Sequence, residues 1–226
     1  MRDALLLPGG HVITVDNSAA IGEKENDIVK VSNELAAYYT IRVALLEQWS
    51  ANAEPQAISL ANFSGDNAWQ PYINGIHQAF KEIGAPMPPI TGSTETNMST
   101  LQSGLSITII GRKLEDTTCA SLVWYVYGQP LVGQEVLEQP QAVADLGRIY
   151  NGWQRGLVKK VWPVGSSGVA KECERLFPNK TIKIEDLDLH KTAGPATAVL
   201  LASHVEDEHI LCDYFGLPLK KVVVQA

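Results

Sequence analysis

Short β-branched runs alternate with amphipathic helical segments over the first half of the chain, and this alternation restricts the fold more than any other feature. Strands are predicted at residues 11–16, 27–31, 57–63 and 103–112. Helices are predicted at residues 33–50, with Ser32 or Asn33 as the cap, and at residues 67–83. We therefore expect an α/β domain in which two helices cover one face of a sheet of four or slightly more strands.

The spacing of the apolar residues also predicts which side chains face the core. In the first helix they are Leu35, Tyr39, Val43 and Leu46. In the second helix they are Trp69, Ile73, Ile76, Phe80 and Ile83. In the strand at residues 103–112 the inward residues are Leu105, Ile107 and Ile109.

The second half of the chain predicts another α/β unit. It opens with the apolar strand CASLVWYVYG and continues with a helix near residues 141–156 and a strand at residues 158–164. A helix is predicted directly after GSSG. The segments TIKI, ATAVLLA and LKKVVV are strand-like, and VEDEHILCDYFG is helical. We place the boundary between residues 112 and 118 without a flexible linker, which gives domains of residues 1–113 and 114–226.

Composition narrows the classes of function. A hydrophobic content of 45% supplies a core, and the net charge of -7 without a basic run argues against binding nucleic acid or a membrane surface. No stretch approaches the roughly 18 apolar residues of a membrane span, and the start of the chain lacks a signal-peptide pattern, so we expect a cytoplasmic protein. Cys119, Cys173 and Cys212 are far apart, and we interpret them as reduced thiols.

Three segments carry oxygen or nitrogen groups suited to a nucleotide and a metal ion. In the first, Asp16 ends a predicted strand, and the small-residue loop that follows contains Asn17, Ser18, Gly22 and Lys24. A carboxylate at a strand end can hold a divalent cation, and a nearby ammonium can meet the phosphates that the cation bridges. An ordinary polar turn is the alternative, because Asp, Asn and Ser are common turn residues.

The second segment is Glu47, near the end of the first helix, and the third is the run Gly92, Ser93, Thr94 and Glu95. Glu47 can join Asp16 in a metal cluster, although an exposed helical glutamate is the simpler interpretation. The third segment is crowded with the oxygen groups that Mg²⁺ prefers. A polar hairpin loop is the alternative there.

Two loops of the second half have similar alternatives. The run Gly165–Gly168 (GSSG) opens a helix whose free N–H groups can bind an anion, but a plain helix start is the simpler interpretation. The run from His190 to Pro195 precedes a buried strand, and by itself it predicts only a loop.

The order of these segments resembles the AIR-synthase-related (PurM-like) ATP-binding superfamily. In that family a TDGVGTK-like segment is followed by a helix reading roughly VNDLLAMGAEP and by a GGETAEM or GGDT-like segment before a strand. Here VDNSAAIGEKE, VALLEQWSANAEP, ITGSTETNM and SGLSITIIGR occupy those places. The match covers about residues 11–112, and later echoes are weaker. The resemblance implies a PurM-like fold of two α/β domains that binds ATP and Mg²⁺.

Carried over by position, the resemblance implies the site residues. Asp16 takes the place of a metal-binding and catalytic aspartate, Lys24 that of a phosphate-contacting and catalytic lysine, and Glu47 that of the aspartate of the ND pair. Thr94 aligns with the third family carboxylate without gaps, whereas Glu95 reaches that place with a shift of one residue. The family's acidic loop upstream of the first strand is missing. The implied metal ligands are Asp16, Glu47 and Glu95, and the implied ATP contacts are Asn17, Ser18, Gly22, Lys24, Gly92, Ser93 and Thr94.

Within the superfamily, the compact length and the segments VDNSAAIGEKENDIVKV and PITGSTET most resemble a short group that includes α-ribazole kinase. This resemblance implies phosphoryl transfer from ATP to the 5′-hydroxyl of an α-riboside, a small-molecule substrate of cobalamin biosynthesis. A synthase that activates an amide or carboxylate, or a regulatory ATP-binding protein without catalysis, is the alternative. Family members pair their first sheets across a twofold axis, which implies a homodimer.

Overall fold

The chain divides into two compact units, and each is described by itself. The computed structural model describes residues 2–115, 121–216 and 218–225. The units are residues 1–115 and 116–226, so the division lies close to the boundary expected from the sequence. Both units combine a sheet with helices, as the predicted α/β class requires. Cys119, at the start of the predicted strand CASLVWYVYG, lies outside the described residues.

Unit 1 (residues 1–115) is built on a five-stranded sheet. Its spatial order is β1 (Ala4–Leu6), β2 (His11–Ala19), β7 (Gly104–Lys113), β5 (Ala53–Asn62) and β6 (Ile90–Thr94). All neighbours are antiparallel except β5 and β6, which are parallel. The strands β1 and β6 lie at the two edges of the sheet, and neither was among the strands predicted from the sequence.

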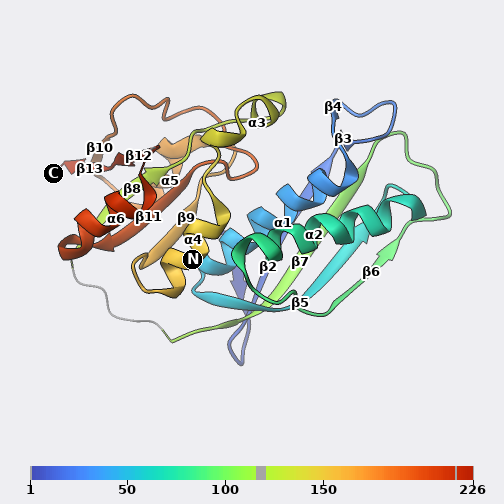
Figure 1. Ribbon diagram of the computed structural model, residues 1–226, viewed down its shortest axis with the longest axis horizontal. Helices are drawn as coiled ribbons and strands as arrows, with labels where there is room; N and C mark the ends of the chain where they lie inside the picture. Colours follow the sequence, from blue (N-terminus) through green and yellow to red (C-terminus); the bar gives the residue numbers. More distant parts are fainter. Residues whose placement is uncertain (1, 116–120, 217, 226) are drawn as a thin grey trace. The chain divides into compact units, whose positions relative to one another are not determined.

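The strand expected at residues 27–31 is not part of this sheet. Only Val29–Lys30 (β4) is extended, and it pairs with the short β3 (Ile21–Gly22). The reason is the side chain of Asp27, which accepts hydrogen bonds from the backbone N–H groups of Lys24 (2.8 Å) and Ser103 (2.7 Å). These bonds fold the segment into a compact loop at the end of the sheet (Figure 1).

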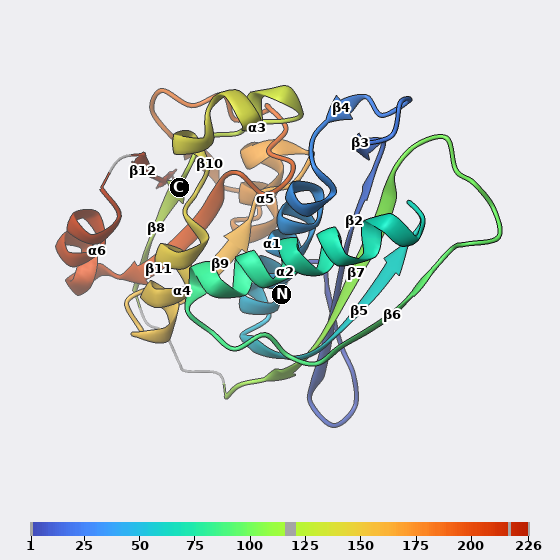
Figure 2. The same cartoon turned by 45° about the vertical axis from the view of Figure 1, so that its right-hand side comes forward.

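Helices α1 (Asn33–Ser50) and α2 (Trp69–Ile83, preceded by the short η1, Asp66–Ala68) lie side by side on one face of the sheet (Figures 1 and 2). The hydroxyl oxygen of Ser32 accepts from the N–H of Leu35 (3.1 Å), which confirms the predicted cap. The predicted inward stripe of α1 is wrong in part. Because α1 packs on the sheet and also against α2, its fully buried surface is broader than one stripe and includes Ala37, Ile41, Ala44, Leu45 and Gln48.

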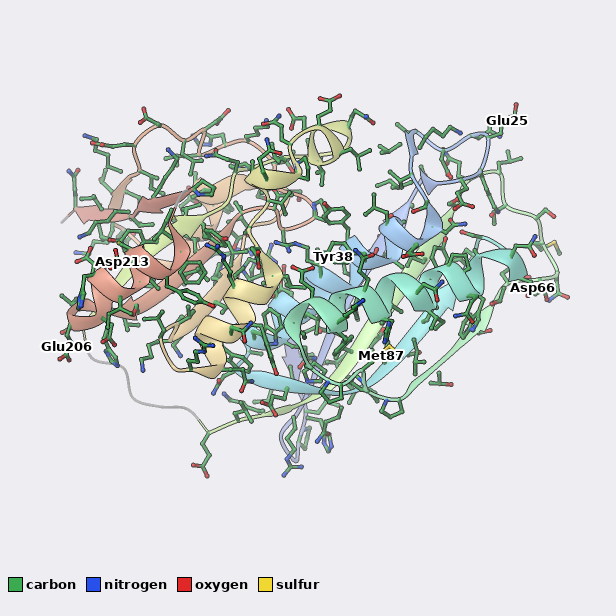
Figure 3. The ribbon with its side chains drawn as sticks, in the orientation of Figure 1. Glu25, Tyr38, Asp66, Met87, Glu206 and Asp213 are labelled. Carbon is green, nitrogen blue, oxygen red and sulfur yellow. The ribbon has the colours of Figure 1, made fainter. Side chains whose placement is uncertain are left out.

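The two helices cross where α2 carries Gly75. A Cβ atom at this position would lie 2.0 Å from the carbonyl oxygen of Glu34 and 2.9 Å from the amide nitrogen of Tyr38, both in α1. Farther along the crossing, the hydroxyl of Tyr38, which is labelled in Figure 3, donates to Glu82 of α2 (2.6 Å). The absence of a side chain at Gly75 therefore sets how closely the helices approach.

The two faces of the sheet differ in burial. Leu105, Ile107 and Ile109 of β7 point toward the helices and are fully buried, as predicted. On the other face, Leu5, Val15 and Ile110 are 59%, 52% and 38% exposed. The sheet of unit 1 thus presents exposed aliphatic side chains on the side that its helices do not cover.

Unit 2 (residues 116–226) has an antiparallel sheet in the order β12 (Leu219–Lys221), β8 (Leu122–Tyr127), β11 (Val199–His204) and β9 (Lys160–Pro163). A separate pair joins β10 (Thr181–Lys183) to β13 (Val223–Gln225). The helices are α3 (Gln134–Glu138), α4 (Leu146–Gln154), α5 (Gly168–Leu176) and α6 (Glu208–Phe215), with short turns η2 (Pro140–Ala142) and η3 (Val205–Asp207). The helix expected from residue 141 begins only at Leu146, because Asp145 caps it by accepting from the N–H of Arg148 (2.7 Å).

The core of unit 2 contains Cys173, packed among residues that include Val126, Val169 and Leu200. Burial raises the pKa of the Cys173 thiol to about 12, so the thiol is protonated and inert, in line with the prediction for this residue. Cys212 is half-buried and also free. No helix in the described part of the chain is long and apolar enough to cross a membrane.

Candidate active site

Two carboxylates that the sequence assigns to a metal site lie near each other in unit 1. Strand β2 continues to Ala19, so Asp16 is within the strand, and Asn17 and Ser18 are strand residues rather than loop residues. Because side chains alternate along a strand, Asp16 points to the same face as Thr14, whose hydroxyl donates to the carbonyl of Ala44 in α1 (2.9 Å). Glu47 follows Ala44 by one helical turn and is only 2% exposed, which excludes the simpler interpretation of an exposed glutamate.

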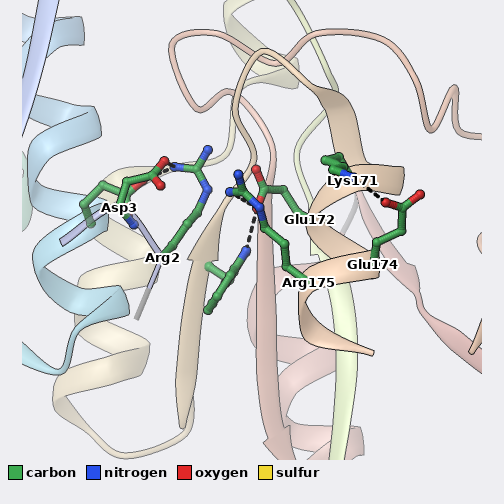
Figure 4. A network of polar contacts seen from close by, with 8 residues as sticks. Arg2, Asp3, Lys171, Glu172, Glu174 and Arg175 are labelled. Carbon is green, nitrogen blue, oxygen red and sulfur yellow. Dashed lines mark hydrogen bonds and ion pairs between the residues drawn. The ribbon is translucent and has the colours of Figure 1, made fainter. Parts of the chain in front are cut away.

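The strand β1 brings a third carboxylate and a cation to this pair. Because Ala4 is paired with Thr14, the residues just before β1 lie beside Asp16. The N–H of Asp3 donates to Glu47 Oε2 (3.2 Å), and the guanidinium of Arg2 donates to Glu47 Oε1. Arg2 also pairs with the carboxylate of Asp3 (2.9 Å) (Figure 4).

The family's acidic loop was expected to be missing before the first strand, but the structure has a further strand, β1, with Asp3 directly before it. That expectation took β2 as the first strand, and β1 with Asp3 in front of it was missed. The available signal was the run Ala4–Leu7, a short apolar segment directly after Asp3 and one turn before β2. We call Arg2, Asp3, Asp16 and Glu47 the carboxylate cluster.

Burial and mutual repulsion make the cluster receptive to positive charge. Burial raises the pKa of Asp16 to about 7; the Asn17 backbone N–H lowers it, the Glu47 carboxylate raises it and Arg2 lowers it. Burial also raises the pKa of Glu47, while Arg2 and the Asp3 amide act in the opposite direction. Mg²⁺ is commonly bound by one or two carboxylates together with waters and substrate phosphates. The pair Asp16 and Glu47 fits that donor set.

Glu95 is not brought to this pair. The cross-strand register aligns Asp16 with Ile107, Leu60 and Gly92, so Gly92 lies three strand spacings, about 14 Å, from Asp16. Glu95 lies beyond the end of β6, where its carboxylate accepts from the N–H groups of Asn97 (2.7 Å) and Met98 (3.1 Å). Within the described ranges, no three His, Cys, Asp or Glu side chains are arranged to hold a metal ion, so the predicted trio of Asp16, Glu47 and Glu95 is not assembled in the chain.

The other residues of the third segment have structural contacts. A Cβ atom on Gly92 would lie 2.0 Å from the carbonyl oxygen of Leu60 and 2.9 Å from the ring of Trp69, so packing alone requires glycine there. Thr94 accepts from the side-chain amide of Asn62 (3.2 Å). Ser93 is exposed within β6.

Lys24 also lies in a contact network away from the cluster. Its ammonium donates to the carbonyl (2.9 Å) and the hydroxyl (2.5 Å) of Thr100, joining the loop after β3 to the loop before β7. Gly22 packs against Ser103, whose hydroxyl would lie 2.5 Å from a Cβ atom at that position. The structure thus gives both residues roles in closing one end of the sheet, where Figure 3 shows Glu25 at the loop tip.

The two loops singled out in unit 2 pack against each other. The N–H of Ala170 in α5 donates to the carbonyl of Leu189 (2.8 Å), and the N–H of Ala193 donates to that of Gly165 (3.2 Å). Asp188 accepts from the N–H groups of His190 (3.0 Å) and Lys191 (3.2 Å). The first two bonds join the start of α5 to the segment from Leu189 to Ala193, and the bonds to Asp188 form a turn within that segment.

Comparison with known proteins adds information at the level of the fold. No protein-family model matches the sequence, and no curated protein matches it. Solved structures do match over nearly the whole chain. Thiamine-monophosphate kinase from Stenotrophomonas maltophilia K279a is 14% identical with a TM-score of 0.62, covering 99% of this chain and 89% of that one.

Two structures of the hydrogenase maturation protein HypE are similar to the same extent. HypE in complex with ATP is 12% identical with a TM-score of 0.64, covering 98% of this chain and 78% of that one. The HypE-HypF complex matches at 16% identity and a TM-score of 0.64, covering 99% of this chain and 87% of that one. The chain therefore shares the fold of these structures, and the PurM-like fold predicted from the sequence motifs is confirmed.

Proposed function

We propose that this chain is a Mg-ATP-dependent kinase that phosphorylates a hydroxyl group of a small molecule. The observation that carries the proposal is the pair formed by half-buried Asp16 on β2 and fully buried Glu47 on α1, in a fold that a thiamine-monophosphate kinase and an ATP-bound HypE share. Carboxylates with raised pKa values are typical of functional sites, and here burial raises the pKa of both, with a further contribution from Glu47 to Asp16 and from Asp3 to Glu47.

The chemistry suits such a site. Phosphoryl transfer depends on positioning and charge neutralisation rather than on a covalent nucleophile. Asp16 and Glu47 would hold Mg²⁺, with Asp3 adjacent through its backbone N–H bond to Glu47. Bound Mg²⁺ supplies neutralisation of the triphosphate charge. Gly92, Ser93 and Thr94 of β6 are proposed to contact ATP, and so is Lys24 once its contacts with Thr100 rearrange.

The preferred acceptor is the 5′-hydroxyl of an α-riboside such as α-ribazole. The γ-phosphoryl group would pass from ATP to the 5′-oxygen, ADP would leave, and the hydroxyl proton would be released. This proposal rests on the sequence segments around Asp16 and Thr94 that resemble the short kinase group. A synthase acting on an amide, or a regulatory ATP-binding protein, is the alternative.

We also propose that the chain forms a homodimer through the open face of the unit 1 sheet. Leu5, Val15 and Ile110 are exposed on this face, and aliphatic side chains gathered on a sheet are typical of an interaction surface. A second copy placed across a twofold axis would bury the same residues from both chains.

The test is incubation of the purified chain with Mg-ATP and α-ribazole, followed by mass spectrometry of the products. A phosphorylated riboside supports the kinase. ADP release stimulated only by an amide would instead identify a synthase, and ATP binding without turnover a regulatory protein. Asp16→Asn is expected to abolish transfer, because it keeps the size of the side chain but removes a charge that would hold Mg²⁺. The matched control Asp66→Asn, at the exposed start of η1 (Figure 3), is expected to retain activity.

A further inference from the structure

Arg2 introduces a permanent positive charge into the carboxylate cluster. Its guanidinium donates to Glu47 Oε1 and pairs with Asp3 Oδ2 at 2.9 Å. The Arg2 side chain is only 10% exposed, so this charge is screened less than an exposed one. Figure 4 shows the side chain directed at Asp3.

The guanidinium and a metal ion would need the same oxygen. Arginine remains protonated at any relevant pH, so its charge cannot be removed by titration. A Mg²⁺ ion binds carboxylate oxygens at about 2.0–2.1 Å and demands near-ideal octahedral geometry. Glu47 Oε1 already accepts from Arg2, and its Oε2 accepts from the Asp3 N–H. A divalent ion on Glu47 must therefore displace Arg2 or be repelled by it.

Arg2 also explains how the cluster persists without metal. Glu47 is fully buried, and a buried carboxylate without a counter-charge is strongly destabilising. The positive charge of Arg2 acts on Glu47 directly and on Asp16 through space. The cluster is thus neutralised in part before any ligand binds.

We propose that Arg2 is an internal counter-cation that competes with divalent metal for Glu47, so that metal binding requires Arg2 to release this carboxylate. The inference rests on the proposed function, because it concerns the metal site of that function. It assigns Arg2 the role of a positioning residue that sets metal affinity. The ligand class is a hard divalent cation, for which Mn²⁺ is the probe.

The test compares Arg2→Gln with the wild type and with Arg112→Gln, an exposed arginine of unit 1. All chains begin at the same residue and carry any tag at the C-terminus. Mn²⁺ binding is measured by electron paramagnetic resonance without nucleotide or acceptor, and thermal unfolding is measured with and without metal. We expect Arg2→Gln to bind Mn²⁺ about tenfold more tightly, to unfold at a lower temperature without metal, and to recover stability when Mn²⁺ is added. Arg112→Gln should match the wild type.

Unchanged or weaker Mn²⁺ binding by Arg2→Gln would overturn the inference, as would the absence of Mn²⁺ binding by all three chains. If Arg2→Gln does not fold, the wild type decides the question by phenylglyoxal modification of Arg2, read by mass spectrometry. We expect Mn²⁺ to accelerate this modification, and an unchanged rate overturns the inference. The kinase assay is independent of these readouts: loss of the proposed function shows as absent phosphoryl transfer, whatever Mn²⁺ binding does.

Discussion

Replacing Gly75 by alanine tests whether the contact between α1 and α2 is as close as the structure shows. In an exposed helix this change stabilises by about 1 kcal/mol, because alanine is the better helix former. Here the new Cβ would lie 2.0 Å from the carbonyl oxygen of Glu34 and 2.9 Å from the amide nitrogen of Tyr38. Favourable contacts of carbon lie near about 3.5 Å, so the backbone of α1 must move away by about 1 Å or more.

The sign of the effect follows from comparing these two terms. Overpacking of a core costs about 1–3 kcal/mol when side chains can adjust, and the obstacle at Gly75 is backbone that cannot rotate away. We expect a net loss of about 1–2 kcal/mol, equivalent to a fall of roughly 5–10 °C in Tm for a unit of this size. The matched control is Gln78→Ala, at an exposed position of the same helix, with a change within about 0.5 kcal/mol.

Urea unfolding monitored by circular dichroism measures the loss, and hydrogen exchange of peptides from α1 and α2 assigns it to unit 1. Faster exchange should be confined to these helices and to the strands beneath them. A Gly75→Ala variant at least as stable as the wild type would refute the close crossing, because only the helix-propensity term would then remain.

Three further predictions concern the site, pH and assembly. Glu95→Gln should reduce kcat less than Asp16→Asn, because Glu95 caps its own loop while Asp16 lies in the carboxylate cluster; an equal loss in steady-state kinetics would contradict this. Burial acts to raise the pKa of Asp27, which is 6% exposed, but its hydrogen bonds from Ser103 and Lys24 outweigh burial and hold that pKa below its ordinary value. The stabilisation that ionised Asp27 gives to the fold should therefore be complete above the ordinary pKa of about 3.9 and be lost as pH falls through the lowered pKa. Asp27→Asn should reduce the free energy of unfolding by about 1–3 kcal/mol at neutral pH and by much less in acid. Equal losses in urea unfolding at both pH values would rule this out. In sedimentation equilibrium the wild type should have twice the 24.6 kDa chain mass, and Val15→Glu, which places a charge on the exposed sheet face, should shift toward one chain mass. A wild-type monomer that still binds ATP would eliminate the dimer.

Local patterns made the elements of unit 1 predictable, and side-chain contacts between distant segments decided what was not. The alternation at Leu105, Ile107 and Ile109 and the cap at Ser32 depend on nearby residues, and both were predicted correctly. The strand at residues 27–31 fails because Asp27 bonds to Ser103, which is remote in sequence.

The candidate site, too, was predictable only in part. Asp16 and Glu47 were predicted from the family pattern, and the structure places them near each other. Asp3 was missed because β1 is only three residues long and too short to show a period. Residue type alone could not show where Lys24 and Glu95 lie. Lys24 is held by Thr100, and Glu95 is held by the N–H groups of Asn97 and Met98.

The position of β7 has a consequence for how unit 1 is made. It is the last strand of its sheet in the sequence, yet it lies between β2 and β5 and pairs with both along their length. During synthesis, the β1–β2 hairpin, both helices and β5 emerge before β7, the strand that joins β2 to β5. Asp16 meets its partner Ile107 only after the intervening chain has closed into a loop, and such distant pairing slows folding. A nascent chain that stops before Gly104 therefore lacks the centre of its sheet and keeps the facing edges of β2 and β5 open to other chains.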